Sequence, residues 1–182
     1  QIEAALGLNG QSLRRQTKRL IGAYFCHEYS YAAAALMNPS VVRHPDQTGL
    51  QADSVRILLS LRAVGEGHIS TIAFREGIVS SGRQISLLPE PPFATAAMLG
   101  KAKGTADDGS VSLYRHRESS ISGTVIFPMT EAQRNGLEDL RLVEFGQESG
   151  KREWIGTYTA YSWRDIRSEL LQTRDFRDFS LT

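Results

Sequence analysis

Short apolar runs, separated by glycine, proline and polar turns, dominate the chain. They occupy residues 55–62, 68–74, 78–88, 111–115, 124–128, 137–145 and 152–161. Runs of this length that are rich in Val, Ile, Leu and Tyr and bounded by turn residues are typical of β-strands. Their close spacing leaves no room for the helices that alternate with the strands of a parallel sheet. The pattern therefore predicts an antiparallel all-β fold, which is a propeller, a barrel or a sandwich.

One segment near the start follows a helical spacing instead. Within residues 11–25, Ser12 is placed to cap the N-terminus, and apolar side chains recur three or four positions apart. The other face carries the basic residues Arg14, Arg15, Lys18 and Arg19. We interpret them as a solvated face, with a helix that binds phosphate or nucleic acid as the alternative. The sequence thus predicts an N-terminal helical segment over residues 1–30 and an all-β part over residues 31–182.

Two further stretches favour helical turns. The alanines of residues 31–37 have high helix propensity, and we expect that turn to end at Asn38-Pro39-Ser40 because proline disrupts a helix. Residues 166–171 form a short apolar run after the last strand-like segment, and they are a second candidate for a helical turn.

Composition excludes several classes of protein. The net charge of +1 over 182 residues gives no argument for nucleic acid or an anionic membrane as a partner, and we expect neither. The longest apolar stretch, residues 31–37, is far too short to span a bilayer. A single cysteine, Cys26, excludes an internal disulfide and fits a reducing compartment, so we expect a cytoplasmic protein. The histidines and acids do not have the spacing of a zinc site, and no metal is expected.

The strongest candidate site lies at the start of the run 137–145. Side chains alternate along a strand, so Asp139 and Arg141 are expected on one face and Glu138 on the other. One interpretation is a weak ion pair at the surface. The other is a carboxyl in a pocket beside a cation, which is an arrangement that suits a catalytic or sugar-binding acid. Tyr158, Tyr161 and Trp163 follow nearby, and such aromatic rings suit carbohydrate.

Arg62 is the second candidate. It closes an apolar run, residues 57–61, where a charge is costly unless it is paired or exposed. It is either an exposed strand end or an arginine that reaches a sugar hydroxyl or a carboxylate. The residues themselves leave both interpretations open.

Ordered motifs over most of residues 20–179 resemble glycoside hydrolase family 130. They include Ile21-Gly22-Ala23-Tyr24-Phe25, Asn38-Pro39-Ser40-Val41-Val42, His44-Pro45-Asp46-Gln47, Ser60-Leu61-Arg62-Ala63, Val125-Ile126-Phe127-Pro128, Asn135-Gly136-Leu137-Glu138-Asp139 and Thr157-Tyr158-Thr159-Ala160-Tyr161. The family contains β-mannoside phosphorylases and related β-mannosidases on a five-bladed β-propeller. The resemblance implies that this chain holds about two blades of such a propeller and is part of a longer protein.

The resemblance also implies roles for individual residues. Asp139 matches the family's general acid, and Asn38 and Arg62 match positions that contact the sugar. Arg141 and Tyr161 lie beside the pocket, and Tyr161-Ser162-Trp163 stands where the family has Tyr-Asp-Gly.

The implied reaction inverts the configuration of the mannosyl carbon. The acid protonates the glycosidic oxygen, in phosphorylases by way of a sugar hydroxyl, and phosphate or water attacks the opposite face. Phosphate would then be a co-substrate, and no cofactor is expected. Residues that hold the nucleophile are expected beyond Thr182. The expected partner is a mannose-containing oligosaccharide, with self-association left open. The alternative is a carbohydrate-binding or degenerate propeller piece without catalysis.

Overall fold

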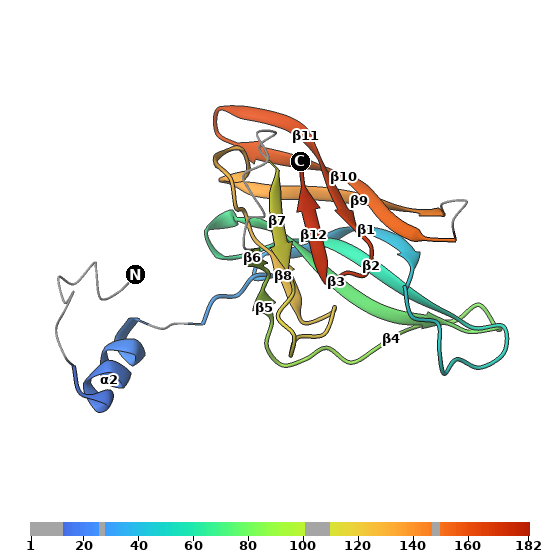
Figure 1. Cartoon of the computed structure of the whole chain (residues 1–182), viewed down its shortest axis with the longest axis horizontal. Coiled ribbons are helices and arrows are strands. Elements are labelled where there is room, and N and C mark those ends of the chain that lie inside the picture. Colours follow the sequence, from blue (N-terminus) through green and yellow to red (C-terminus); the bar gives the residue numbers. More distant parts are fainter. Residues whose placement is uncertain (1–12, 26–27, 101–109, 147–149) are drawn as a thin grey trace. The chain divides into compact units, whose positions relative to one another are not determined.

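The computed structural model describes residues 13–25, 28–100, 110–146 and 150–182. The chain divides into two compact units, residues 1–30 and residues 31–182. The first contains helix α2, Arg15–Phe25 (Figure 1). This helix confirms most of the helix expected over residues 11–25, while its expected cap, Ser12, lies outside the described residues, as does Cys26. No helix in the described part of the chain is long and apolar enough to cross a membrane.

The second unit is built from strands. They are β1 (Ala35–Arg43), β2 (Val55–Val64), β3 (Ser70–Val79), β4 (Ile85–Leu87), β5 (Thr95–Ala96), β6 (Met98–Leu99), β7 (Val111–Tyr114), β8 (Thr124–Ile126), β9 (Gly136–Gly146), β10 (Arg152–Ser162), β11 (Asp165–Thr173) and β12 (Asp178–Leu181). Two short 3-10 turns, η1 (Glu66–His68) and η2 (Glu131–Gln133), complete the unit. The all-β prediction is therefore confirmed for this part of the chain.

The strands hydrogen-bond in the order β1-β2-β3-β9-β10-β11-β12-β7-β6, with β4 and β8 paired to β3, and β5 paired to β8. Neighbours are antiparallel except at β3–β9 and β5–β8. The described strands form one open sheet in which separate blades are not distinguished, so the propeller stays a prediction. The two expected helical turns are wrong. Residues 31–34 form turns and bends, β1 begins at Ala35, and β11 covers residues 166–171. Long ladders with β2 and β10 outweigh the local helix propensity.

Strands β3 and β9 meet at one ladder pair among the described residues. Ser70 of β3 pairs in parallel with Gly136 of β9. A Cβ atom added at Gly136 would lie 2.6 Å from the Cβ of Ser70, so only glycine fits at this approach. Figure 1 shows β9, β10 and β11 side by side above β2 and β3.

Serine side chains satisfy the edge of β9 beyond this contact. The Ser60 hydroxyl of β2 donates to the Leu140 carbonyl at 3.3 Å, and the Leu142 N–H donates to Ser40 Oγ of β1 at 3.1 Å. A buried backbone group without a partner is costly, so these serines let β9 run beside β1 and β2 without a ladder.

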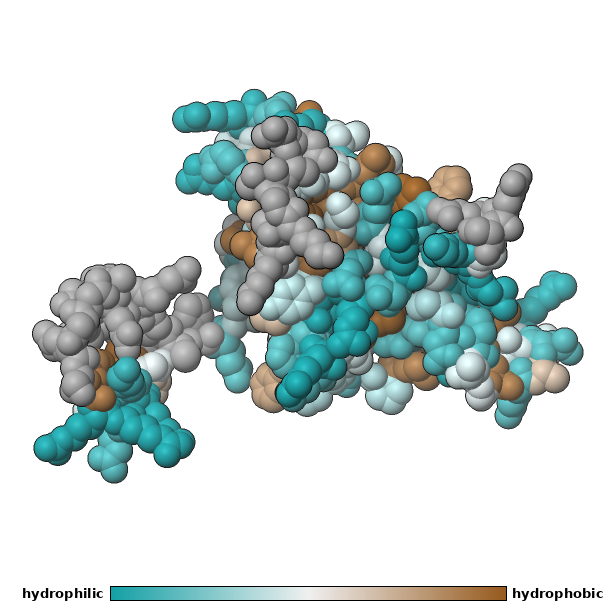
Figure 2. All heavy atoms as spheres, in the orientation of Figure 1, coloured by the Kyte–Doolittle hydropathy of each residue, from teal (hydrophilic) through white to brown (hydrophobic). Residues whose placement is uncertain are grey.

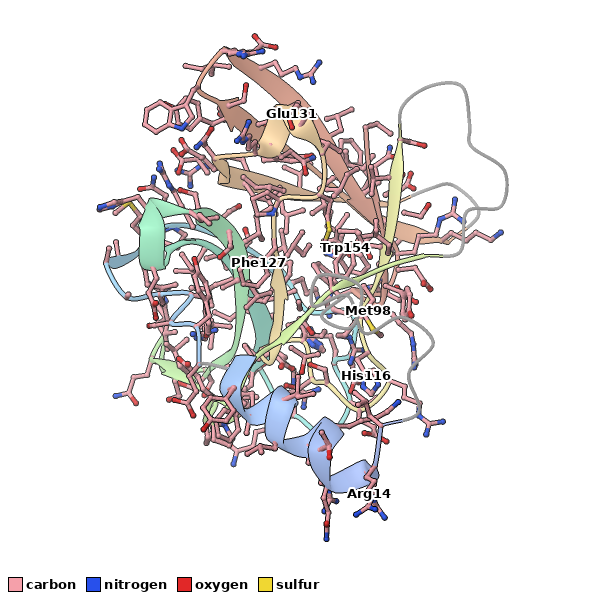
Figure 3. The ribbon with its side chains drawn as sticks, turned by 90° about the vertical axis from the view of Figure 1, so that its left-hand side faces the viewer. Arg14, Met98, His116, Phe127, Glu131 and Trp154 are labelled. Atoms are coloured by element: carbon pink, nitrogen blue, oxygen red, sulfur yellow. The ribbon has the colours of Figure 1, made fainter. Side chains whose placement is uncertain are left out.

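Aromatic rings pack together in the core of this unit. Phe176 lies 5.2 Å from Trp154 and 5.8 Å from Phe74, measured between ring centroids. Trp154 is buried between the strands in Figure 3, and its indole N–H donates to the Arg43 carbonyl at 3.2 Å. On the outside, polar residues cover most of the face seen in Figure 2, with apolar patches between them.

A polar cluster anchors η2 against the sheet. Gln133 donates to Tyr158 Oη and to Glu169 Oε2, both at 2.8 Å, and the Tyr158 hydroxyl donates to the same Glu169 oxygen at 2.6 Å. Burial, together with the neighbouring Glu169 carboxylate, raises the pKa of Tyr158, so this hydroxyl stays protonated as a donor. The cluster fixes the segment that leads into β9.

A second buried polar pair joins β3 to the end of β1. Glu76 Oε1 lies 3.3 Å from Nε2 of the buried His44, and the Ser122 hydroxyl and N–H donate to Glu76 Oε2 at 2.8 and 3.2 Å. The close His44 imidazole, and then the hydrogen bonds from Ser122, lower the pKa of Glu76 from its ordinary 4.5 to about 2.

Replacing Glu76 by Gln should make stability less sensitive to acid. Because the folded-state pKa is about 2 against 4.5 in the unfolded chain, the carboxylate stabilises the fold above pH 4.5, and this contribution is lost as the pH falls toward 2. At about 1.4 kcal/mol per pKa unit, Glu76→Gln should lower the free energy of unfolding at pH 7 by at most about 3 kcal/mol. Urea unfolding at pH 7, 5 and 3 measures the free energy of unfolding of Glu76→Gln and of the parent protein. Glu131→Gln, at an exposed residue, is the control. Equal pH dependence in Glu76→Gln and the parent protein would contradict the assignment.

Gly136→Ala should destabilise the fold by about 1–3 kcal/mol, because the new methyl group overpacks the contact with Ser70. Gly146→Ala in the same strand is the matched control, since nothing lies within 4 Å of a Cβ there. Chemical denaturation compares the two variants. A second change, Ser70→Gly, should restore part of the loss by removing the clashing Cβ. Equal stability of the two single variants would refute the close approach.

Candidate functional site

Two β-bulges bring Asn38 and Asp139 together. One extra residue enters β1 between Met37 and Ser40, and another enters β9 opposite the step from Thr157 to Thr159. At these bulges Asn38 has φ of 53° and Asp139 has φ of 56°, in the left-handed region that Asn and Asp tolerate better than most residues. The Asn38 amide donates to Asp139 Oδ1 at 2.6 Å. Two residues far apart in sequence thus meet through backbone irregularities.

Arg62 is the centre of the cluster. Its Nη2 lies 2.6 Å from Glu138 Oε1, its Nε donates to Ser70 Oγ at 3.0 Å, and its Nη1 lies 3.7 Å from Asp139 Oδ1. The Ser70 hydroxyl donates to Glu138 Oε1 at 3.3 Å, which closes a ring of polar contacts. The contact between β3 and β9 at Gly136 brings Ser70 next to Glu138. Of the two interpretations of Arg62, the structure shows an arginine that reaches carboxylates.

The bulge at Asp139 also overturns the expected division of faces. Regular alternation places Glu138 away from Asp139, yet Arg62 contacts both acids because the extra residue interrupts the alternation. Arg141 was expected to be the partner of Asp139, but its guanidinium donates to the Pro39 carbonyl at 2.7 Å. Arg141 therefore ties β9 to the bulge of β1, and Arg62 supplies the cation near the acid.

The cluster has one cation for two carboxylates. The Arg62 and Glu138 side chains are 23% and 21% exposed, whereas the Asp139 side chain is 40% exposed. Both contacts of Asp139 fall on Oδ1, and no described residue bonds Oδ2. Asp139 is thus held on one oxygen and reaches solvent, which is the geometry of a carboxyl that can act on a ligand.

Tyr161 lies on the same sheet face as Glu138. Thr159 is the direct cross-strand partner of Glu138, and Tyr161 follows two residues later on β10. Its ring lies 5.8 Å from that of Trp163 in an edge-to-face arrangement. The face that carries the acids therefore continues into a pair of aromatic rings.

Sequence reasoning missed Ser70 and gave Glu138 a minor part. The signal that could have found Glu138 is the polar pair Glu138-Asp139 inside an apolar strand, together with the Asn38-Pro39 step in β1, because both favour bulges. Ser70 carried no signal of its own, since its role depends on the approach of Gly136 from a distant strand.

A larger hollow lies elsewhere. It has a volume of about 690 Å³ between β7, β11 and β12, and its lining includes Tyr114, Arg174 and Asp178. None of the predicted site residues lines it. Among the described residues, no group of three or more His, Cys, Asp or Glu side chains is arranged to hold a metal ion.

No family model, curated protein or solved structure matches the chain. The resemblance to glycoside hydrolase family 130 therefore stays a prediction, carried by the quoted motifs.

Replacing Arg62 by Met should destabilise the fold by about 1.5–3 kcal/mol, because it removes charge-assisted bonds and leaves two carboxylates side by side. Adding Glu138→Gln should recover part of this loss, since the double variant keeps a single carboxylate at the cluster. A double-mutant cycle by urea unfolding measures the coupling. Additive effects of the two changes would argue against the ion pair.

Proposed function

We propose that Asn38, Arg62, Glu138 and Asp139 form the acid side of a site that cleaves β-mannosidic bonds, with Asp139 as general acid. The observation that carries the proposal is the meeting of three residues that the family resemblance named independently. Asn38, Arg62 and Asp139 come from β1, β2 and β9. Asp139 Oδ1 lies 2.6 Å from the Asn38 amide nitrogen and 3.7 Å from Arg62 Nη1. The proposal includes the five-bladed propeller, a mannose-containing oligosaccharide as ligand, and a cytoplasmic location.

The role of general acid requires Asp139 to carry a proton when the substrate is bound. With both acids ionised, Arg62 faces two negative charges. When Asp139 carries a proton, Glu138 alone balances Arg62 and the cluster becomes neutral. The proton on Oδ2, the oxygen that no described residue bonds, can then pass to the glycosidic oxygen, directly or through a sugar hydroxyl.

Glu138 has a positioning role in this mechanism. It binds the Arg62 guanidinium and accepts from Ser70, so it keeps Arg62 close to Asp139. The attacking group is phosphate or water on the opposite face of the sugar.

One observation favours a second function, which is carbohydrate binding without catalysis. Asp139 Oδ1 accepts a 2.6 Å hydrogen bond from Asn38 and lies 3.7 Å from Arg62 Nη1, so it acts as an acceptor in this structure. An ionised carboxylate with an exposed edge accepts hydrogen bonds from sugar hydroxyls and need not donate a proton. In this case, mannoside binding should survive the loss of the charge at Asp139.

Asp139→Asn separates the two functions. If Asp139 is the general acid, the variant should cleave β-1,2- or β-1,4-mannobiose about 10²–10⁴-fold more slowly, with or without phosphate, while still binding it. Asp53→Asn is the matched control, because Asp53 also has a positive φ, of 58°, but lies in the turn between β1 and β2. The assay uses the full open reading frame that encodes this chain.

Calorimetric titration of mannobiose into Asp139→Asn and Asp53→Asn then measures the affinity of each variant for the sugar. An unchanged cleavage rate in Asp139→Asn overturns the general acid. Mannobiose binding by both variants, with no cleavage by the parent protein under either condition, supports the second function.

A further inference from the structure

A second hollow lies at the end of the β10–β11 hairpin. It has a volume of about 250 Å³. It is lined on one side by residues of η2 and the two that follow, Arg134 and Asn135, and on the other by the turn at residues 162–165. Glu131 of η2, which lines it, is labelled beside these strands in Figure 3. The hollow is comparable in size to one small polar ligand, and none of the four residues of the acid cluster lines it.

Trp163 is the main apolar surface at this hollow. Its side chain is 79% exposed, although a large aromatic ring gains most from burial. The backbone beneath it is fixed, since the Trp163 N–H donates to Asn135 Oδ1 at 3.0 Å and the Asn135 N–H donates to the Tyr161 carbonyl at 2.9 Å. An exposed ring on a fixed backbone is pre-organised to receive a ligand.

The rim of the hollow carries arginine side chains, which donate hydrogen bonds, and carboxylates, which accept them. Arg164 has no hydrogen bond or ion pair with any described residue. Arg134 lies 3.4 Å from Glu131, and Arg167 lies 3.9 Å from Asp165. Because acids accompany two of the three arginines, the rim suits a neutral ligand with many hydroxyl groups better than a polyanion. An aromatic face with polar groups around it is the usual surface for a pyranose ring.

Register links this hollow to the acid cluster. From Glu138 the cross-strand partner is Thr159, and Tyr161 stands two residues farther on the same face, which is about 7 Å along the strand. The Tyr161 ring then packs edge-to-face against that of Trp163, with 5.8 Å between the ring centroids. The aromatic pair therefore bridges the acid cluster and the hollow.

We propose that Trp163 and the hollow beside it form a further saccharide subsite, which binds a distal unit of an oligosaccharide whose reacting unit lies at Asp139. This inference rests on the proposed function, because the acid cluster defines where the first unit lies. The subsite makes the protein selective for longer chains over disaccharides, since only longer chains reach Trp163.

Tryptophan fluorescence tests this inference directly. Trp154 is 2% exposed, and the difference in acrylamide quenching between a protein and its Trp163→Ala variant reports on Trp163 alone. A β-linked mannotetraose titrated into Asp139→Asn, which should not cleave it, is expected to protect Trp163 from quenching, whereas mannobiose should protect it little. Trp163→Ala should bind the tetrasaccharide about tenfold more weakly and the disaccharide within twofold of the parent. Phe93→Ala, at an exposed aromatic residue on another segment, should leave both affinities unchanged.

The outcomes separate this inference from the proposed function. Protection of Trp163 by the tetrasaccharide in a protein that cleaves no mannoside supports the subsite and counts against the general acid. Cleavage with equal affinity for both saccharides, or with no protection of Trp163, overturns the subsite and leaves the general acid standing. A protein that neither binds nor cleaves either saccharide overturns both.

Discussion

The approach of Gly136 to Ser70 is the contact on which the rest of the β unit depends. It is the point where the β1–β3 strands and the β9–β11 strands join into one hydrogen-bonded sheet. The same contact places the Ser70 hydroxyl between Arg62 and Glu138. A side chain at position 136 would push these two halves apart, and the ion pair would separate with them. Fold and site thus share one steric constraint.

Local patterns predicted several long strands, though not β1 and β11, because glycine, proline and alternating apolar residues act over a few positions. The long strands β2, β9 and β10 begin within two residues of their expected starts. The faces of Glu138 and Asp139 could not be predicted in the same way. A bulge depends on pairing with a partner strand, and the strand that pairs with β9 on either side of Asp139 is β10, beyond the next turn. The role of Ser70 depends on a still more distant approach.

In the candidate site, too, some features could be predicted from the sequence and others depend on tertiary pairing. The family resemblance named Asn38, Arg62 and Asp139, and the structure brings them into one cluster. Arg141 was also named, but it bonds a backbone carbonyl of β1. Regular strand geometry assigned the cation to the nearest arginine along the chain, whereas the folded sheet supplies it from another strand. Electrostatic partners across a sheet follow from tertiary register, which sequence spacing does not contain.

The left-handed backbone at Asn38 and Asp139 narrows the residues that each position can accept. Asn, Asp and Gly are the ones that tolerate this conformation best, whatever chemistry the side chain performs. A lineage that lost its activity would still be held to this short set by the backbone alone. The presence of an acid at position 139 is therefore weak evidence for activity by itself, and the residues around it that sit on regular backbone, Arg62 above all, are more sensitive indicators of whether the chemistry has been retained.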